Sequence, residues 1–272
     1  MALLDDRRVL ITGASAGLGF GIASELAARG ARTLIVSRSE GNIRDASKRI
    51  MERLKTTGPA AGVSAWNAPI PLAADITHPD AAAVLAAAAG DRLGGLDVLV
   101  CNAGGPPPGD FSELNDWHWE EAFRLILLAP VRLIRACLPL LRAGGSGRII
   151  LISSISGLRP IPRLLLSNTL RPGLMGLARH LGSELAPDGI LINAIAPGFF
   201  ETERSREVQE AIAGSTGRSV EDVQEELTAR IPLRRQGDPA ELGRYIAFLV
   251  SEENTYITGH TLLIDGGLFN AP

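Results

Sequence analysis

Short, continuous apolar runs alternate with amphipathic stretches from one end of the chain to the other. A strand that is apolar at every position is buried on both faces, which is typical of a parallel sheet covered by helices on both sides. The 272 residues lie near the upper limit for one hydrophobic core. We therefore predict a single domain over residues 1–272, a doubly wound α/β fold with seven parallel strands. These strands are expected at Val9–Thr12, Thr33–Val36, Ile70–Ala74, Leu96–Val100, Arg148–Ile152, Leu191–Ile195 and Thr261–Ile264.

The helices between the strands follow from the spacing of apolar residues. Leu18, Ile22 and Leu26 recur at four-residue intervals, as one face of an amphipathic helix requires. The segment from Glu203 to Gln236 differs from the others because it is highly charged and has glycines in its middle. We predict two short helices there, which would form a substrate lid over residues 203–236.

The composition excludes several classes of protein. With 46% apolar and 21% charged residues, the chain is typical of globular proteins and not of disordered ones. A net charge of −3 without a long basic run argues against a nucleic-acid partner. The apolar runs are too short to cross a bilayer, and the N-terminus lacks the apolar stretch of a signal peptide. We expect a cytoplasmic protein with small-molecule partners and without a membrane partner.

The chain contains two cysteines, Cys101 and Cys137. One follows an apolar run and the other lies within a helical pattern, so we expect neither a disulfide framework nor a metal site. Both are predicted to be buried thiols in a reducing compartment.

A glycine-rich segment follows the first predicted strand directly and opens the first predicted helix. Glycines at such a turn let the backbone approach a pyrophosphate, whose charge is stabilised by amides at the helix N-terminus. The strand and the helix around the segment favour a Rossmann-type dinucleotide site over an ordinary turn. The residues expected to bind the cofactor here are Thr12, Gly13, Ser15, Gly17, Leu18 and Gly19.

The end of the second predicted strand indicates which nicotinamide cofactor is bound. An acidic residue there favours NAD, and a basic neighbourhood favours the 2′-phosphate of NADP. Ser37 and Arg38 occupy this turn, and no carboxylate does. A guanidinium and hydroxyls suit a phosphate, so we predict NADP in preference to NAD.

These residues, with several others, resemble the short-chain dehydrogenase/reductase family, and in particular bacterial beta-ketoacyl carrier-protein reductases. The glycine motif agrees with the family pattern, and so does the C-terminal part of the chain, including Asn193, Thr258-Gly259 and Asp265-Gly266-Gly267. The further cofactor-binding residues that the resemblance implies are Asp75, Ile76, Asn102, Ala103, Gly104, Pro197, Gly198 and Thr202.

The resemblance also implies an activity and an assembly. Members of the family transfer a hydride between a nicotinamide cofactor and a carbonyl or alcohol, and they are usually homodimers or homotetramers. The apolar stretches Leu125–Leu141 and Leu174–Leu185 could form such contacts between subunits, or could be buried within one subunit.

The chain departs from the family pattern at the reacting end of the site. Family members use asparagine, serine, tyrosine and lysine, and this chain keeps only the serine, Ser154. Ser167 stands at the tyrosine position, Arg171 at the lysine position and Ile126 at the asparagine position. We predict Ser154, Ser167 and Arg171 as the catalytic residues, with Arg171 also binding the cofactor ribose.

These replacements weaken proton transfer. An aliphatic hydroxyl is a far weaker acid than a phenol, whose pKa is about 10, and an arginine stays protonated. Ile126 should be an apolar packing residue that neither bends the helix through a side-chain bond nor holds a water. Pro172 should bias Arg171 away from helical geometry and could redirect its side chain.

Other proton donors have little support in the sequence. Tyr245 and Tyr256 lie outside the segments that carry catalysis in the family, and His118 and His180 are isolated histidines on predicted helices. Protonation by water or by the substrate is a further route.

Three functions remain open at this point. The first is an NADP-dependent oxidoreductase with altered proton transfer. The second is a cofactor-binding or regulatory protein without turnover, because three catalytic positions have changed. The third is a halohydrin dehalogenase-like enzyme, since those relatives carry arginine at the lysine position. They keep the tyrosine and lose the glycine-rich site, however, which disfavours this last hypothesis.

Overall fold

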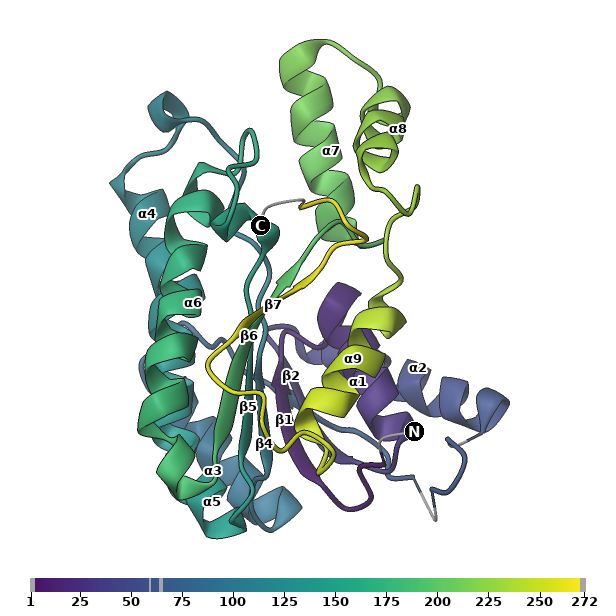
Figure 1. The fold of residues 1–272 in the computed structure, drawn as a ribbon, viewed down its shortest axis with the longest axis vertical. Coiled ribbons are helices and arrows are strands. Elements are labelled where there is room, and N and C mark those ends of the chain that lie inside the picture. Colours follow the sequence, from purple (N-terminus) through teal and green to yellow (C-terminus); the bar gives the residue numbers. More distant parts are fainter. Residues whose placement is uncertain (1–2, 59, 64–65, 270–272) are drawn as a thin grey trace.

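Seven parallel strands form one sheet in the computed structural model, which describes residues 3–58, 60–63 and 66–269 (Figure 1). Their order across the sheet is β3-β2-β1-β4-β5-β6-β7. The chain changes direction across the sheet after β3, so that β1 lies between β2 and β4. The strands are β1 Arg8–Thr12, β2 Arg32–Ser37, β3 Ile70–Ala73, β4 Val98–Cys101, β5 Arg148–Ile152, β6 Leu191–Pro197 and β7 Thr261–Ile264. All seven predicted strands are confirmed, with ends that differ from the predicted ones by two residues at most.

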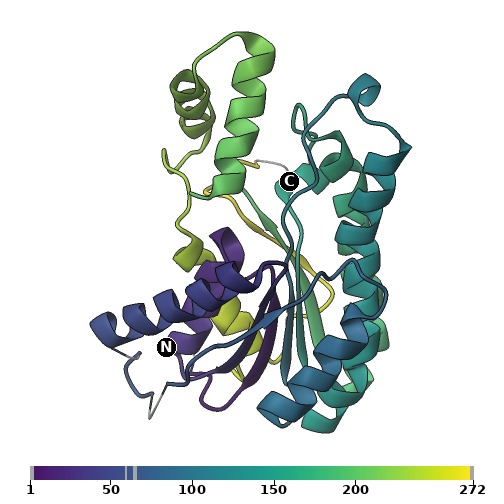
Figure 2. The same ribbon diagram turned by 180° about the vertical axis from the view of Figure 1, so that it is seen from behind.

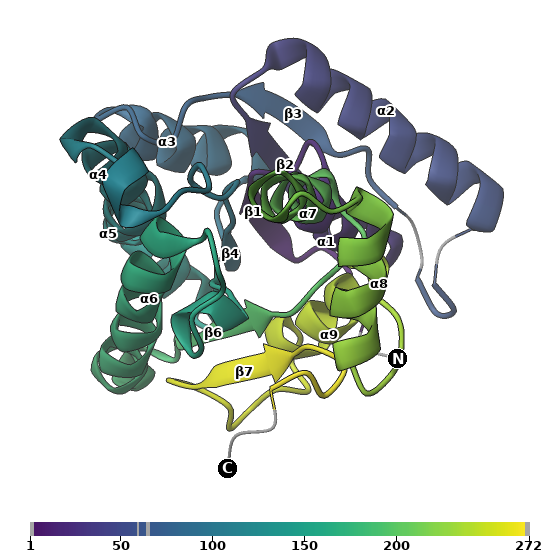
Figure 3. The same cartoon turned by 90° about the horizontal axis from the view of Figure 1, so that it is seen from above.

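Helices cover both faces of the sheet, as Figure 3 shows from above. On β1, Val9 and Ile11 belong to one hydrophobic cluster and Leu10 to the other, because successive side chains point to opposite faces. The first cluster is covered by α1 (Gly17–Ala28), α2 (Glu40–Thr57) and α9 (Pro239–Val250), and the second by α3 (Ala81–Leu93), α5 (Ala129–Gly144) and α6 (Leu165–Glu184). The predicted doubly wound, single-domain architecture is confirmed.

The helix that contains Ile126 is irregular. Helix α4 (Asp116–Phe123) continues into α5 through a π-helical segment, Arg124–Leu128. Pro130 has no N–H to donate to the carbonyl of Ile126, and the N–H of Ala129 donates to Arg124 O, five residues back. The distortion therefore arises from the backbone beside Pro130 and needs no polar side chain at position 126.

Helix α6 continues through Pro172, contrary to the expected effect of this proline on Arg171. Arg171 lies inside the helix, and its side chain is buried. Its Nη1 donates hydrogen bonds to Ile152 O (2.7 Å) and Ser153 O (2.9 Å) at the end of β5. These tertiary contacts of a buried charged group outweigh the local preference of the residue that precedes a proline.

Two helices rise beyond the carboxyl ends of the strands, where Figures 1 and 2 show them standing apart from the sheet. They are α7 (Glu203–Thr216) and α8 (Val220–Arg230), and they confirm that the charged segment folds as two helices. The side chains of Thr202 and Ser219 cap them by accepting hydrogen bonds from the amides of Ser205 and Asp222. Short 3₁₀ helices occupy Phe111–Glu113, Ile155–Gly157 and Ala186–Asp188.

Both cysteines are buried and unpaired, as predicted. Burial raises the pKa of the Cys101 thiol and raises that of Cys137 to about 12. In the described part of the chain, no three His, Cys, Asp or Glu side chains gather into a possible metal site. Every helix within the described ranges is too short or too polar to span a bilayer.

Candidate active site

A pair of hydrogen bonds joins the carboxyl ends of the central strands β1 and β4. The hydroxyl of Thr12 donates to Asn102 O (2.7 Å) and accepts from the backbone N–H of Asn102 (3.0 Å). The side-chain amide of Asn102 donates to Gly13 O (3.0 Å). Because Thr12 is fully buried and Asn102 nearly so, these bonds fix the start of the glycine-rich loop to the neighbouring strand.

The glycines of this loop are required by close backbone packing. Gly13 has a φ of +60°, and a Cβ there would lie 2.7 Å from Asn102 O. A Cβ on Gly19 would lie 2.0 Å from Gly13 O. The start of α1 is thereby held against the end of β1, and Ala16 at its N-cap offers no side-chain acceptor to the first-turn amides. Those amides can bind an anion instead.

One cleft of about 690 Å³ runs along the carboxyl ends of the strands. It contacts both the glycine-rich loop and the predicted catalytic residues, and α7 contributes to its wall. The predicted site residues that line it are Gly13, Ser15, Gly17, Leu18, Ser37, Arg38, Asp75, Ile76, Asn102, Ala103, Gly104, Ser154, Ser167, Arg171, Pro197, Gly198 and Thr202. Thr12 and Gly19 do not line this cleft; they support its floor through the contacts just described.

The cleft wall also contains residues that the sequence did not indicate, including Trp117, Glu121, Ile161, Leu164 and Phe199. They come from α4, the loop before α6 and the segment after β6, which are far apart in the sequence. Most are apolar or aromatic, so no residue type marked them. Only the tertiary structure brings them together.

Arg38 is exposed at one end of the cleft, beside Asp75. Partial burial disfavours ionisation of Asp75, but hydrogen bonds from the N–H and the hydroxyl of Thr77 and the charge of Arg38 outweigh it, leaving its pKa below the ordinary value. Asp75 is therefore a fixed carboxylate at neutral pH. Ser37 donates from its hydroxyl to Ser39 O (3.2 Å), and its side chain is partly exposed to the cleft.

Hydrogen bonds link three serines, Ser154, Ser156 and Ser167, at the other end of the cleft. Ser154 Oγ accepts a hydrogen bond from the N–H of Ser156 (3.1 Å), and Ser156 Oγ lies 2.9 Å from Ser167 Oγ. Ser156 was not predicted, because nothing in the sequence separates it from an ordinary turn residue. It is 1% exposed, whereas Ser154 and Ser167 line the cleft.

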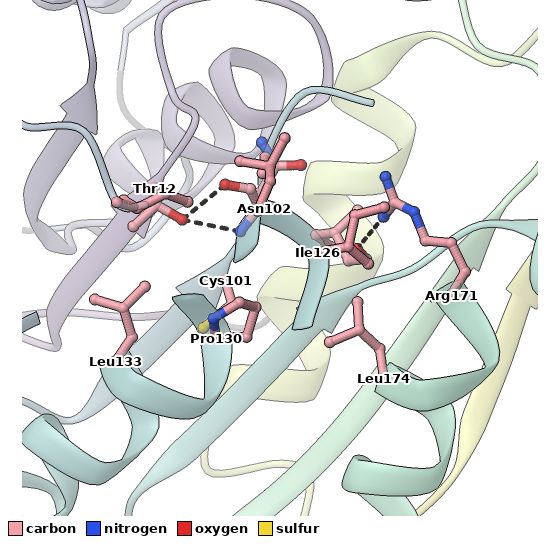
Figure 4. Close-up of a pocket in the computed structure, with 12 residues that line it drawn as sticks. Thr12, Cys101, Asn102, Ile126, Pro130, Leu133, Arg171 and Leu174 are labelled. Atoms are coloured by element: carbon pink, nitrogen blue, oxygen red, sulfur yellow. Dashed lines mark hydrogen bonds between the residues drawn. The ribbon is translucent and has the colours of Figure 1, made fainter. Parts of the chain in front are cut away.

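Arg171 adds a positive charge to this end of the cleft. Burial, together with the nearby charge of Arg204, lowers the pKa of Arg171 to about 10, so the guanidinium remains protonated at neutral pH. Figure 4 shows it extending from α6 toward the backbone carbonyl that it contacts. Ile126 is buried beside it, on the wall of a small cavity of about 10 Å³, and packs as the apolar residue we predicted.

The other candidate proton donors lie away from the cleft. His118 accepts from the N–H of Asn115 at the start of α4, and His180 is exposed and paired with Glu184. Tyr256 is 96% exposed, and partial burial raises the pKa of Tyr245. None of these four side chains is among the described residues that line the cleft.

Comparison with known proteins identifies the family. Residues 13–269 match the model of a family described as enoyl-(acyl carrier protein) reductase. The chain is 30% identical to human dehydrogenase/reductase SDR family member 4, over 97% of this chain and 88% of that protein. It belongs to the short-chain dehydrogenase/reductase family. It is accordingly an oxidoreductase.

Relatives within the family include reductases that are named for different substrates. The 3-oxoacyl-[acyl-carrier-protein] reductase of Vibrio cholerae is 30% identical, with 98% of each chain covered. The crystal structure of L-sorbose reductase from Gluconobacter frateurii, complexed with NADPH and L-sorbose, superposes with a TM-score of 0.88 at 28% identity and covers both chains fully. The short-chain dehydrogenase/reductase fold is thus preserved along the whole chain, while the roles of the individual site residues remain predictions.

The Thr12 hydroxyl should be essential to the stability of this site. Thr12→Val keeps the side-chain shape but leaves the N–H and C=O of Asn102 without their buried partner, so we expect the free energy of unfolding to fall by about 3 kcal/mol. Thr12→Ser keeps the hydroxyl and should cost about 1 kcal/mol for the lost methyl group. Urea unfolding measures both, and equal losses would contradict the assigned role of the hydroxyl.

Proposed function

We propose that this protein is an NADP(H)-dependent oxidoreductase that interconverts a small-molecule carbonyl and its alcohol. The observation that carries this proposal is that one cleft joins the glycine-rich loop at the start of α1 to the Ser154, Ser167 and Arg171 side chains. A dinucleotide bound along the cleft would thus have one end near hydrogen-bond donors suited to a reacting oxygen.

The glycine-rich loop fits a dinucleotide. A side chain at Gly13 or Gly19 would collide with backbone, and the first-turn amides of α1 have no capping side chain. Gly13, Ser15, Gly17 and Leu18 would hold the diphosphate, while Asp75, Ile76, Asn102, Ala103 and Gly104 would lie along the nucleosides. The nicotinamide would supply or accept the hydride.

Arg38 supports NADP in preference to NAD. Its guanidinium is exposed at the cleft, and Asp75, the acid whose pKa its charge lowers, follows β3 and not β2. A planar cation beside the hydroxyls of Ser37 and Ser39 suits a phosphate dianion. L-sorbose reductase, the structural relative described above, was crystallised with NADPH.

The chain's own residues would act on the substrate by hydrogen bonding and charge. Ser154 and Ser167 would donate to the carbonyl oxygen, and the protonated Arg171 would favour the negative charge that develops there. Arg171 would also hydrogen-bond ribose hydroxyls. Neither a serine hydroxyl nor an arginine is a strong proton donor, so the alcohol oxygen would take its proton from water.

The segment 203–236 would act as the substrate lid. Helix α7 contributes Glu203, Arg204 and Val208 to the cleft, and Arg204 donates to Pro106 O (2.6 Å) on the opposite loop. This contact connects the helix to the segment that follows β4. A substrate in the cleft would therefore lie beneath α7.

We further propose a homodimer or homotetramer in the cytoplasm. Several leucines are only partly buried within the subunit: Leu127 just before α5, Leu138 on α5, and Leu177 and Leu181 on α6. Their exposed apolar surface supports a second copy of the chain as their partner. Two free, buried thiols support a reducing compartment.

Arg38 should determine the choice between the two cofactors. Arg38→Leu removes the cation proposed to contact the 2′-phosphate, so NADPH affinity should fall at least about tenfold while NADH affinity changes little. Arg44→Leu, a matched change on α2 at an exposed arginine paired with Glu40, should alter neither affinity. Fluorescence titration measures both. An equal loss for NADPH and NADH in Arg38→Leu would contradict the assignment.

Turnover tests the proposed function directly. NADPH oxidation followed at 340 nm with a panel of ketones and aldehydes should reveal a substrate, and Ser154→Ala should lower kcat by about a hundredfold with NADPH affinity unchanged. Ser215→Ala, an exposed serine on α7, is the matched control and should retain full activity. If the wild-type protein binds NADPH tightly but turns over no faster than the Ser154→Ala variant, it is a cofactor-binding protein without catalysis.

A further inference from the structure

We propose that Ser156 is a positioning residue that aims the hydroxyls of both Ser154 and Ser167 into the cleft. This inference rests on the proposed function, because it gives these two hydroxyls their role at a reacting oxygen. Ser156 itself lies behind them, 1% exposed and outside the cleft wall. Its backbone N–H contacts the hydroxyl of Ser154, and its own hydroxyl contacts that of Ser167.

The direction of the hydroxyl–hydroxyl bond follows from what each group can satisfy. A serine hydroxyl has one proton to donate and two lone pairs. In the described part of the chain, Ser156 Oγ has Ser167 Oγ as its hydrogen-bond partner at 2.9 Å and no other. If Ser167 were the donor, the proton of Ser156 would be buried without an acceptor, which is unfavourable. Ser156 is therefore the donor and Ser167 the acceptor.

The same reasoning applies to Ser154. Its Oγ accepts from the backbone N–H of Ser156 at 3.1 Å, as the N-cap of the short helix Ile155–Gly157. Accepting this bond leaves the hydroxyl proton of Ser154 available. Both side chains line the cleft, so each free proton can be donated to an acceptor bound there, such as a carbonyl oxygen.

The packing of the short helix fixes this arrangement. A Cβ on Gly157 would lie 2.8 Å from Met175 Cε and 3.0 Å from Arg171 Cβ, so the turn that carries Ser156 lies closely against α6, which carries Ser167. A serine side chain has three staggered rotamers, and an unbonded one would populate several. The hydrogen bond from Ser156 holds the Ser167 side chain in one of these rotamers.

The donation can be measured without turnover by placing a thiol at position 167. In Ser167→Cys, a hydrogen bond from Ser156 Oγ stabilises the thiolate and lowers the thiol pKa. Removing the donor in Ser156→Ala/Ser167→Cys should therefore raise that pKa by about one pH unit. The rate of alkylation by iodoacetamide as a function of pH gives both values. The natural cysteines are buried, with raised pKa values, so wild-type protein gives the background rate.

The matched control removes a different buried hydroxyl. Ser24→Ala/Ser167→Cys changes a serine on α1 that is 2% exposed and lies outside the cleft, and it should leave the thiol pKa of Ser167→Cys unchanged. A pKa that is the same with and without Ser156, or equally shifted by the Ser24 change, would overturn the proposal.

A second measurement applies if the cysteine variants do not fold. Crystal structures of the wild-type protein and of Ser156→Ala should show the Ser167 side chain in one rotamer in the first and in several in the second. An unchanged single rotamer would overturn the proposal. Neither measurement needs a substrate, so the absence of carbonyl turnover would refute the proposed function and leave the assignment of Ser156 to be decided by these results.

Discussion

The hydroxyl of Thr12 and the backbone of Asn102 connect the two central strands at the point where the sheet changes direction. In an open parallel sheet this point leaves a crevice beyond the strand ends, and ligands bind there. The two bonds bring β1 and β4 together at their carboxyl ends, and the amide of Asn102 then holds Gly13. The start of α1 depends on the resulting loop, because Gly19 packs directly on the carbonyl of Gly13.

The two ends of the cleft differ in how far they follow the family pattern. At the loop end, the backbone forms the site, and a side chain at Gly13 or Gly19 would collide with backbone atoms. At the reacting end, side chains form the site, and the resemblance predicts that three of four family positions carry other residues. The side chains there are small hydroxyls beside a buried guanidinium, which can donate hydrogen bonds to a developing negative charge but are weak proton donors.

Much of the fold could be predicted from the sequence because both faces of the sheet are buried. Val9, Leu10 and Ile11 are all apolar for that reason, and such runs mark strands without further information. The glycine-rich loop was predictable because its chemistry depends on local backbone. The helical conformation of Arg171 before Pro172 could not be predicted, because contacts with the carbonyls of Ile152 and Ser153, distant in the sequence, determine it. Ser156 was missed for a similar reason: its partner lies 11 residues away on another helix.

We propose that the reacting end holds the substrate oxygen with hydroxyls and a fixed positive charge, without an ionising proton donor. The pH dependence of kcat for carbonyl reduction tests this most directly, because a donor that titrates imposes its own pKa on the profile. Serine hydroxyls do not titrate in the accessible range, and the pKa of Arg171 is about 10. We therefore expect a constant kcat from about pH 6 to about pH 9. A profile that falls within this range with a single pKa would show that an ionising side chain donates the proton, and would contradict the claim.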